Sequence, residues 1–209
     1  MMRSSLTDAP RALMPWARAL AMVVMLLTLT GCAVMAVSAV VVTASAVHDR
    51  RSVETVVDDQ RLSLAVRQTL NRSNRFAGKA SFDVSTYNGW VLLTGEVETA
   101  DMVEHATALI SDLSNVRRLF NELEVGPTNT LRQTSRDGWI SLQVKAAIAD
   151  IKDLPGFDAS RVKITTRSQV VYLQGLVSEQ ESARIVDQAR QVRGVDKVVV
   201  VFELMPTSD

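Results

Sequence analysis

The residue of this chain best suited to covalent chemistry is Cys32, the only cysteine among 209 residues. It follows Gly31 at the end of an uncharged, largely apolar stretch that begins at Ala19. Before that stretch, residues 1–18 carry three arginines and a single acid, Asp8. A positive region followed by about 7 to 15 apolar residues is typical of a secretory signal peptide. With one cysteine the chain forms no internal disulfide, so this thiol is free for another use.

The run Leu29-Thr30-Gly31-Cys32 resembles the lipobox of bacterial lipoproteins. The resemblance implies cleavage just before Cys32, a diacylglyceryl group on its thiol and usually a third acyl chain on the freed amine. One acyl chain holds a protein only marginally, at roughly 0.8 kcal/mol per buried CH₂, so two or three chains make release negligible. Ala33 stands where lipoproteins kept in the inner membrane tend to carry Asp. The resemblance therefore implies a lipid anchor in the outer membrane, facing the periplasm.

An uncleaved transmembrane helix is the second interpretation of the same segment. Residues 19–47 carry no charge and exceed the roughly 20 residues needed to span a bilayer. Gly31 and Cys32 in the middle, together with the serines and threonines, favour the cleaved lipoprotein.

Charge and composition argue against several classes of function. Residues 32–209 hold 20 basic and 22 acidic residues, because the first 31 take three of the 23 lysines and arginines and one of the 23 acids. Without a basic block, nucleic acid is not expected as a partner. His48 and His105 lie far apart without ligand spacing, so we expect no metal and no cofactor.

Catalysis finds no support in the motifs of the chain. We find no nucleophile-elbow, phosphate-loop or zinc-ligand pattern, so we do not expect an enzyme. Asp58 and Asp59 are interpreted as acids in the polar approach to a helix, where they favour the helix dipole.

The remainder of the chain consists of two copies of one sequence module. The copies are offset by 78 residues between Leu62 and Ile140, by 80 between Leu93 and Leu173, and by 79 near the end. Such small changes indicate short loop insertions between equivalent elements. The matching positions are Leu62, Leu64, Val66 and Leu70 with Ile140, Leu142, Val144 and Ile148; Phe82, Val84, Leu93, Gly95 and Val97 with Val162, Ile164, Leu173, Gly175 and Val177; and Val116, Leu119 and Leu123 with Val195, Val198 and Phe202.

Each copy predicts the order helix, strand, strand, helix, strand. Apolar residues at every fourth position predict the first helix. Asn88-Gly89 predicts a two-residue hairpin between the first two strands, and Ser168-Gln169 is the weaker equivalent. A strand–helix–strand crossover should be right-handed. We therefore expect an α+β fold of two tandem αββαβ modules, each a small mixed three-stranded sheet with two helices on one face.

Two further patterns add local detail to this prediction. Gly95 and Gly175 lie inside strand patterns, where glycine usually marks a bulge or a close backbone approach. Ser178 and Glu181 form a capping box for the last helix.

The strand motifs at 91–97 (VLLTGEV) and 171–177 (VYLQGLV), with the order of the elements, resemble the BON domain. Two such domains behind a lipobox resemble the dual-BON outer-membrane lipoproteins associated with cell division and envelope stress, and the lead-ins 49–53 and 57–59 are also similar. The resemblance covers about residues 29–205. It implies a signal peptide (1–31), an acylated N-terminal tether (32–59), a first BON domain (60–126), a linker (127–136) and a second BON domain (137–205). It also implies binding of anionic phospholipid by the second domain and support of outer-membrane integrity.

The two first helices differ on the faces opposite their apolar cores. Positions Arg61, Leu64, Gln68 and Asn71 suit water in the first copy. In the second copy, tryptophan, leucine and alanines with adjacent lysines suit a membrane interface, where each lysine adds about 1 kcal/mol near an anionic surface. The expected phospholipid-binding residues are Trp139, Leu142, Gln143, Lys145, Ala146, Ala149 and Lys152.

Two other uses of this stripe stay open. It suits a protein adaptor that docks onto an envelope-assembly or peptidoglycan-remodelling complex. It also suits burial between the modules, because modules of about 70 residues have thin cores and tryptophan is common at domain interfaces. Trp90, which begins a strand, is expected to pack on its sheet.

Overall fold

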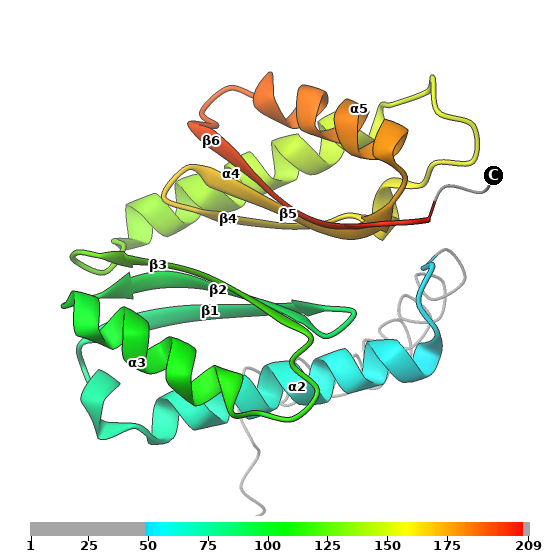
Figure 1. Cartoon of the computed structure of the whole chain (residues 1–209). Coiled ribbons are helices and arrows are strands. Elements are labelled where there is room, and N and C mark those ends of the chain that lie inside the picture. The colour runs from blue at the N-terminus through cyan, green and yellow to red at the C-terminus, as the bar shows by residue number, and fades with distance from the viewer. Residues whose placement is uncertain (1–48, 207–209) are drawn as a thin grey trace, which may run out of the picture. The chain divides into compact units, whose positions relative to one another are not determined.

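The computed structural model of the protein describes residues 49–206 (Figure 1). The predicted signal peptide, the lipid attachment at Cys32, His48 and most of the tether lie outside this range. Within the described residues, no helix is both long and apolar enough to cross a bilayer.

Each half of the described chain has the expected order of elements. The first half contains α2 (Val53–Arg72), β1 (Ala80–Tyr87), β2 (Trp90–Val97), α3 (Ala100–Ser111) and β3 (Arg118–Val125). The second half contains α4 (Leu131–Ala149), β4 (Lys163–Arg167), β5 (Val170–Val177), α5 (Glu179–Arg190) and β6 (Lys197–Leu204). Short 3₁₀ turns, η1 (Asn74–Phe76) and η2 (Ala159–Arg161), precede β1 and β4.

Both sheets are mixed and three-stranded, which confirms the expected α+β class. The strand orders are β1-β2-β3 and β4-β5-β6, with an antiparallel hairpin and then a parallel third strand in each. Both helices of each half lie on one face of its sheet (Figure 1). Between helices and sheet, each half has its own core, built around Val66, Leu93 and Ile110 in the first and around Val144, Leu173 and Ile185 in the second.

The first helix of each half begins earlier than the expected domain boundary. α2 begins at Val53, inside the segment expected as tether, and α4 begins at Leu131, inside the segment expected as linker. The physical reason is capping: the Ser52 hydroxyl accepts the backbone N–H of Thr55, and Thr130 forms a capping box with Gln133. Residues 126–130 lie outside the helices and strands.

The hairpin turns are held by buried carboxylates, and the interpretation of Asp59 from the sequence is wrong. Asp59 is not in the approach to a helix; it lies inside α2, is 4% exposed, and accepts the backbone N–H groups of Asn88 (2.6 Å) and Gly89 (2.8 Å). The backbone of both turn residues is left-handed, with φ of 50° and 72°. Such turns direct two N–H groups to one side, where one carboxylate satisfies both.

The second half repeats this arrangement with different turn residues. Asp137 of α4 is 5% exposed and accepts the backbone N–H groups of Ser168 (2.9 Å) and Gln169 (2.9 Å). The weaker hairpin signal therefore forms the same turn, with φ of 49° and 67°. In both halves the buried carboxylate fixes the first helix relative to the hairpin.

The glycines inside the second strands mark close backbone approaches rather than bulges. A Cβ built on Gly95, whose φ is +134°, would lie 1.9 Å from the carbonyl oxygen of Ser81. At Gly175 the nearest atom is the carbonyl oxygen of Arg161, at 2.9 Å. The strand pairing is continuous through Gly95 on the β1 side and through Gly175 on the β6 side, whereas the pairing of β5 with β4 ends at Gln174.

The two sheets pack against each other through the faces that carry no helices. Leu92, Tyr172 and Val201 form a buried cluster between them, with Trp90 packed against it as expected. The Ser85 hydroxyl donates to the buried amide oxygen of Gln174 across this seam. The helix-free face of each sheet is therefore buried in the contact between the modules, and the helices lie on the outside.

Ion pairs at the ends of the sheets close the same seam. Arg167 binds both oxygens of Glu96, which is 3% exposed, and its Nη2 also donates to the hydroxyl of Ser81 (2.8 Å). At another point, Arg117 donates to Glu203 at 2.8 Å. Opposite charges from the two modules thus fix how the sheets face each other.

The residues just before α2 join both modules. Arg50 makes two hydrogen bonds to Glu181, at 2.7 and 2.8 Å, and a third to the carbonyl oxygen of Leu176 at 2.9 Å. Arg51 donates to Asp59 at 2.6 Å and lies 3.7 Å from the centre of the Tyr87 ring. The end of the segment expected as tether is therefore bound at the junction of the two modules.

Candidate functional site: the outer face of α4

The rotation of α4 about its axis is fixed by its buried side. Ile140, Val144 and Ile148 are 2%, 0% and 0% exposed in the second core, and Asp137 holds the hairpin turn from the same side of the helix. A helix turns 100° per residue, so residues about half a turn away from these must face outward. Trp139 and Leu142 do so, at 63% and 62% exposed.

The other predicted residues surround this pair in different ways. Ala146, Ala149, Lys145 and Lys152 are exposed, whereas Gln143 is half-buried at the side of the stripe. Lys152 makes an ion pair with Asp150 at 3.0 Å, with both side chains exposed, so its charge is shared. Among the described residues Lys145 has no acidic partner, which leaves its ammonium group available to an anion outside the chain.

Sequence reasoning missed the first turn of this face. Leu131 is 88% exposed at the start of α4, and the exposed Arg132 and Arg136 lie along the same helix. The signal was present in the sequence, because Thr130 and Gln133 have the spacing of a capping box. We name the exposed residues Leu131, Trp139, Leu142, Ala146 and Ala149 the outer stripe of α4.

Burial between the modules does not account for the outer stripe, because the seam is made by the sheets. The corresponding face of α2 is also exposed and is polar at three of the five positions equivalent to the outer stripe. Gln68 and Asn71 are exposed, and Arg61 makes an ion pair with Asp58 at 3.0 Å with both side chains open to solvent. The apolar members are Val53 and Leu64, at 68% and 57% exposed, and Val57 beside them is 42% exposed.

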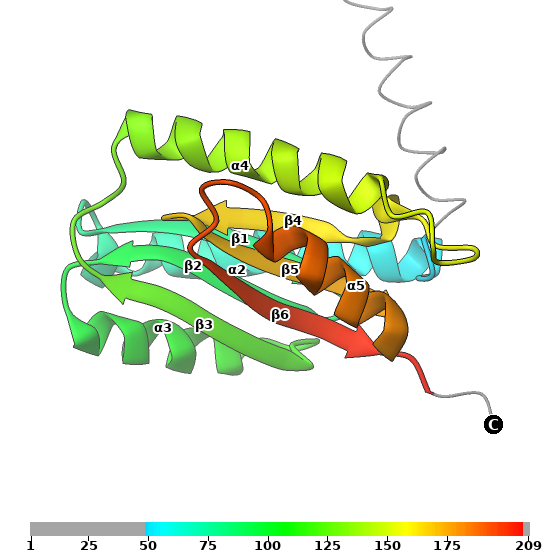
Figure 2. The same cartoon turned by 90° about the horizontal axis from the view of Figure 1, so that it is seen from above.

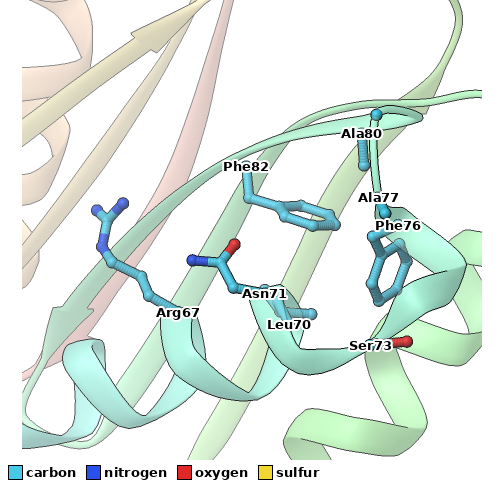
Figure 3. Close-up of a pocket in the computed structure, with 9 residues that line it drawn as sticks. Arg67, Leu70, Asn71, Ser73, Phe76, Ala77, Ala80 and Phe82 are labelled. Atoms are coloured by element: carbon cyan, nitrogen blue, oxygen red, sulfur yellow. The ribbon is translucent and has the colours of Figure 1, made fainter.

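The first module also contains a cavity of about 280 Å³ (Figure 3). Phe76 and Phe82 meet edge to face on its wall, with ring centres 4.9 Å apart. Arg67 at its rim is already committed, to Asp83 at 3.1 Å and to the carbonyl oxygen of Val84 at 2.7 Å. Arg67 is the only charged side chain among the lining residues, so the cavity offers no free charge to a ligand.

Metal binding is not supported in the part of the chain that the structure describes. No cluster of three histidine, cysteine or acidic side chains is close enough to hold an ion there. His105, half-buried, hydrogen-bonds the hydroxyl of Ser73 at 3.0 Å and stacks near Phe76.

Apart from Asp101, which pairs with Arg75 on the surface of the first module, the titratable groups with perturbed pKa values in the described residues lie at the module seam and its margins. Burial tends to raise the pKa of Glu181, but hydrogen bonds from Arg50 and the backbone of Ser178 outweigh it and hold the pKa below its ordinary value. The pKa of Glu203 is lowered in the same way, against burial, by Arg117 and Asn88. A structural ion-pair network explains these shifts without a reaction.

The fold, the repeat and the seam together define a protein of two BON domains. Residues 58–127 and 136–206 each match the BON domain family, so the chain belongs to that family.

Curated relatives match most of the chain. It is 30% identical to the outer membrane lipoprotein DolP of Haemophilus influenzae over 177 residues, which cover 85% of this chain and 90% of the relative. It is 33% identical to the 21 kDa hemolysin of Actinobacillus pleuropneumoniae over 74% of this chain and 78% of that protein. Among solved structures, the C-terminal domain of CdsD, a structural protein of the type III secretion system of Chlamydia trachomatis, aligns with 68% of this chain and 96% of its own at 10% identity and a TM-score of 0.29.

Proposed function

We propose that this protein is an outer-membrane lipoprotein, anchored through acyl chains on Cys32, whose second BON domain binds anionic phospholipid through the outer stripe of α4. The role is one of binding rather than catalysis: it supports the integrity of the envelope, including at the division site. The lipobox and the similarity to an outer membrane lipoprotein support the anchor and the compartment.

The observation that carries the lipid contact is the exposure of Trp139 and Leu142, at 63% and 62%, next to the exposed Lys145, which has no acidic partner among residues 49–206. An indole and an isobutyl group on the outside of a helix favour the boundary between headgroups and acyl chains. The face of α2 related by the repeat lacks the tryptophan, so the two domains are not equivalent toward a membrane.

The expected affinity of the stripe alone is low. Burying one leucine side chain fully is worth roughly 1.5–3 kcal/mol, and each lysine adds about 1 kcal/mol at an anionic surface. A shallow contact therefore amounts to a few kcal/mol, on the order of millimolar affinity. The anchor compensates, because a tethered domain meets lipid at a high effective concentration.

The test is co-sedimentation of the soluble fragment 48–209 with vesicles, with and without anionic lipid and across a salt series. Trp139→Glu should abolish binding to anionic vesicles. Arg61→Glu is the matched control, because position 61 is the equivalent of 139 in the first module and is also open to solvent. Binding that survives Trp139→Glu, or that falls equally with Arg61→Glu, would remove the stripe as the contact.

A protein adaptor remains the competing outcome of the same work. Photocrosslinking in cells from position 142 or 146 should give lipid adducts if the stripe lies in the bilayer. Protein adducts in the absence of vesicle binding would favour an adaptor for an envelope-assembly or peptidoglycan-remodelling complex. Mass spectrometry of the N-terminal peptide tests acylation of Cys32 separately.

A further inference from the structure

The last strand of the second module has an open edge with unusual composition. β6 pairs with β5 on one side only, and it lies at the margin of its sheet (Figure 2). Residues 198–202 are Val-Val-Val-Val-Phe, five apolar residues of high strand propensity in a row. Val200 and Leu204 are 45% and 53% exposed on it. A long apolar edge strand is a template for pairing with another strand.

The equivalent strand of the first module shows what a protected edge looks like. β3 reads RLFNELEV, with Arg118, Asn121, Glu122 and Glu124 distributed along it. The amide of Asn121 is also bound, to the carbonyl oxygen of Val103 at 3.0 Å. Charges of this kind keep an edge from pairing. β6 carries its charges only outside the apolar run, at Lys197 and Glu203.

Those two charges make β6 complementary to itself. If two copies of the strand pair antiparallel about Val200, Lys197 of each copy lies opposite Glu203 of the other, and the apolar residues between them face apolar residues. Opposite charges directly across a strand pair stabilise it, and like charges destabilise it. Among the described residues Lys197 has no ion-pair partner, whereas Glu203 is held ionised by Arg117 and Asn88. The second copy would supply the missing partner of Lys197.

We propose that this protein forms a symmetric dimer through antiparallel pairing of β6 with β6 of a second copy. Such pairing joins the two three-stranded sheets into one, by a two-fold axis perpendicular to the sheet. That axis keeps the helices of both copies on the same face. The two outer stripes of α4 then point to the same side, so both would meet one bilayer if the proposed lipid contact holds.

The test uses the full-length chain in its native membrane, with one cysteine introduced by Val200→Cys. Residues on the two-fold axis of an antiparallel pair have Cα atoms about 4.5–5.5 Å apart, which lies within the range of a disulfide. We expect an oxidised dimer in high yield. Leu64→Cys, similarly exposed on α2, measures random collision, and the unaltered chain measures any contribution of Cys32.

Reversal of one charge tests the register of the proposed strand pairing. Lys197→Glu places glutamate opposite glutamate twice in the dimer and should lower the Val200→Cys crosslink about tenfold, as expected for two inverted pairs. The double variant Lys197→Glu, Glu203→Lys restores opposite charges and should recover the crosslink. The proposal would be overturned if the crosslink yield of Val200→Cys is no higher than that of Leu64→Cys, or if the yield does not change with Lys197→Glu. An adduct with a different protein would also overturn it.

Trp139→Glu separates this inference from the proposed function. It should leave the crosslink at position 200 unchanged, because residue 139 lies on α4 and the paired edge is β6. If Trp139→Glu has no effect on vesicle binding but the crosslink forms, the lipid contact fails and the dimer stands. If the crosslink at position 200 disappears with Trp139→Glu, the chain does not pair through β6 by itself, and the proposed dimer is wrong.

Discussion

Removing the buried carboxylates beneath the hairpin turns should destabilise the protein far more than removing their neighbours. Asp59 and Asp58 are adjacent in sequence, yet Asp59 is 4% exposed and bonded to two backbone amides, whereas the side chain of Asp58 is 54% exposed in a surface ion pair. A hydrogen bond to a charged group contributes about 1.5–3 kcal/mol, and an exposed ion pair about 0–1 kcal/mol. The substitutions Asp59→Ala and Asp58→Ala therefore form a matched pair.

The expected loss is larger in the first module than in the second. Asp137→Ala leaves two backbone N–H groups without their acceptor, and water reaches the half-buried turn in part, so we expect a loss of about 2–4 kcal/mol. Asp59→Ala also removes one of the two carboxylates that pair with Arg51, whose side chain is only 12% exposed; the pair with Asp49 remains. The loss in the free energy of unfolding should therefore be about 1 kcal/mol larger than for Asp137→Ala. Asp58→Ala should change the free energy of unfolding by about 0.5 kcal/mol or less.

Urea unfolding of the 48–209 fragment, followed by circular dichroism, measures these losses. Hydrogen exchange adds a local readout, because the amides of Asn88, Gly89, Ser168 and Gln169 donate to the two carboxylates. Each Asp→Ala variant should speed exchange at its own turn first. If Asp59→Ala and Asp58→Ala lower the free energy of unfolding by the same small amount, or if the turn amides exchange at an unchanged rate, these carboxylates do not stabilise the hairpin turns.

Two further substitutions test the strand approach and the junction of the modules. Gly95→Ala should lower the free energy of unfolding in urea by about 2–5 kcal/mol, because its Cβ would lie 1.9 Å from the Ser81 carbonyl oxygen and its φ is +134°. Gly175→Ala, with a contact of 2.9 Å, should lower it by about 1–2 kcal/mol. Equal losses in the two variants would contradict this interpretation. The lowered pKa of Glu181 means that its bond with Arg50 stabilises the folded state above pH 4.5 and that this contribution is lost as the pH falls through the folded value. Glu181→Gln, which retains the cap, should therefore flatten the fall of stability below pH 4.5 in acid-unfolding curves, and an unchanged slope would count against the bond.

The repeat and its turns were predictable because their signals are local. Apolar residues at every fourth position predict the first helices, and Asn88-Gly89 predicts a hairpin from two adjacent residues that tolerate positive φ. The exposure of Trp139 also follows from periodicity, once Ile140 and Val144 are assigned to the core. The lipid contact itself is still a prediction, since exposure does not identify a ligand.

The arrangement between the modules was beyond sequence reasoning for a physical reason. Arg50 and Glu181 are 131 residues apart, and Ser85 and Gln174 are 89 apart, so no periodicity connects them. Asp59 was misinterpreted for a related reason, because its partners lie on a turn about 30 residues away. Apolar alternation indicates that a sheet has a second face to cover, but it does not say what covers it.

The bond between Arg50 and Glu181 has a mechanical consequence for an anchored protein. Arg50 precedes the first module in the chain but binds the second, so tension on the proposed anchor would enter at the junction and be divided between both modules. A pull on the N-terminal segment would then act on both domains together and would not separate one from the other. A chain ending at residue 126 would lack the acceptor of this arginine and would transmit the same load through α2 alone.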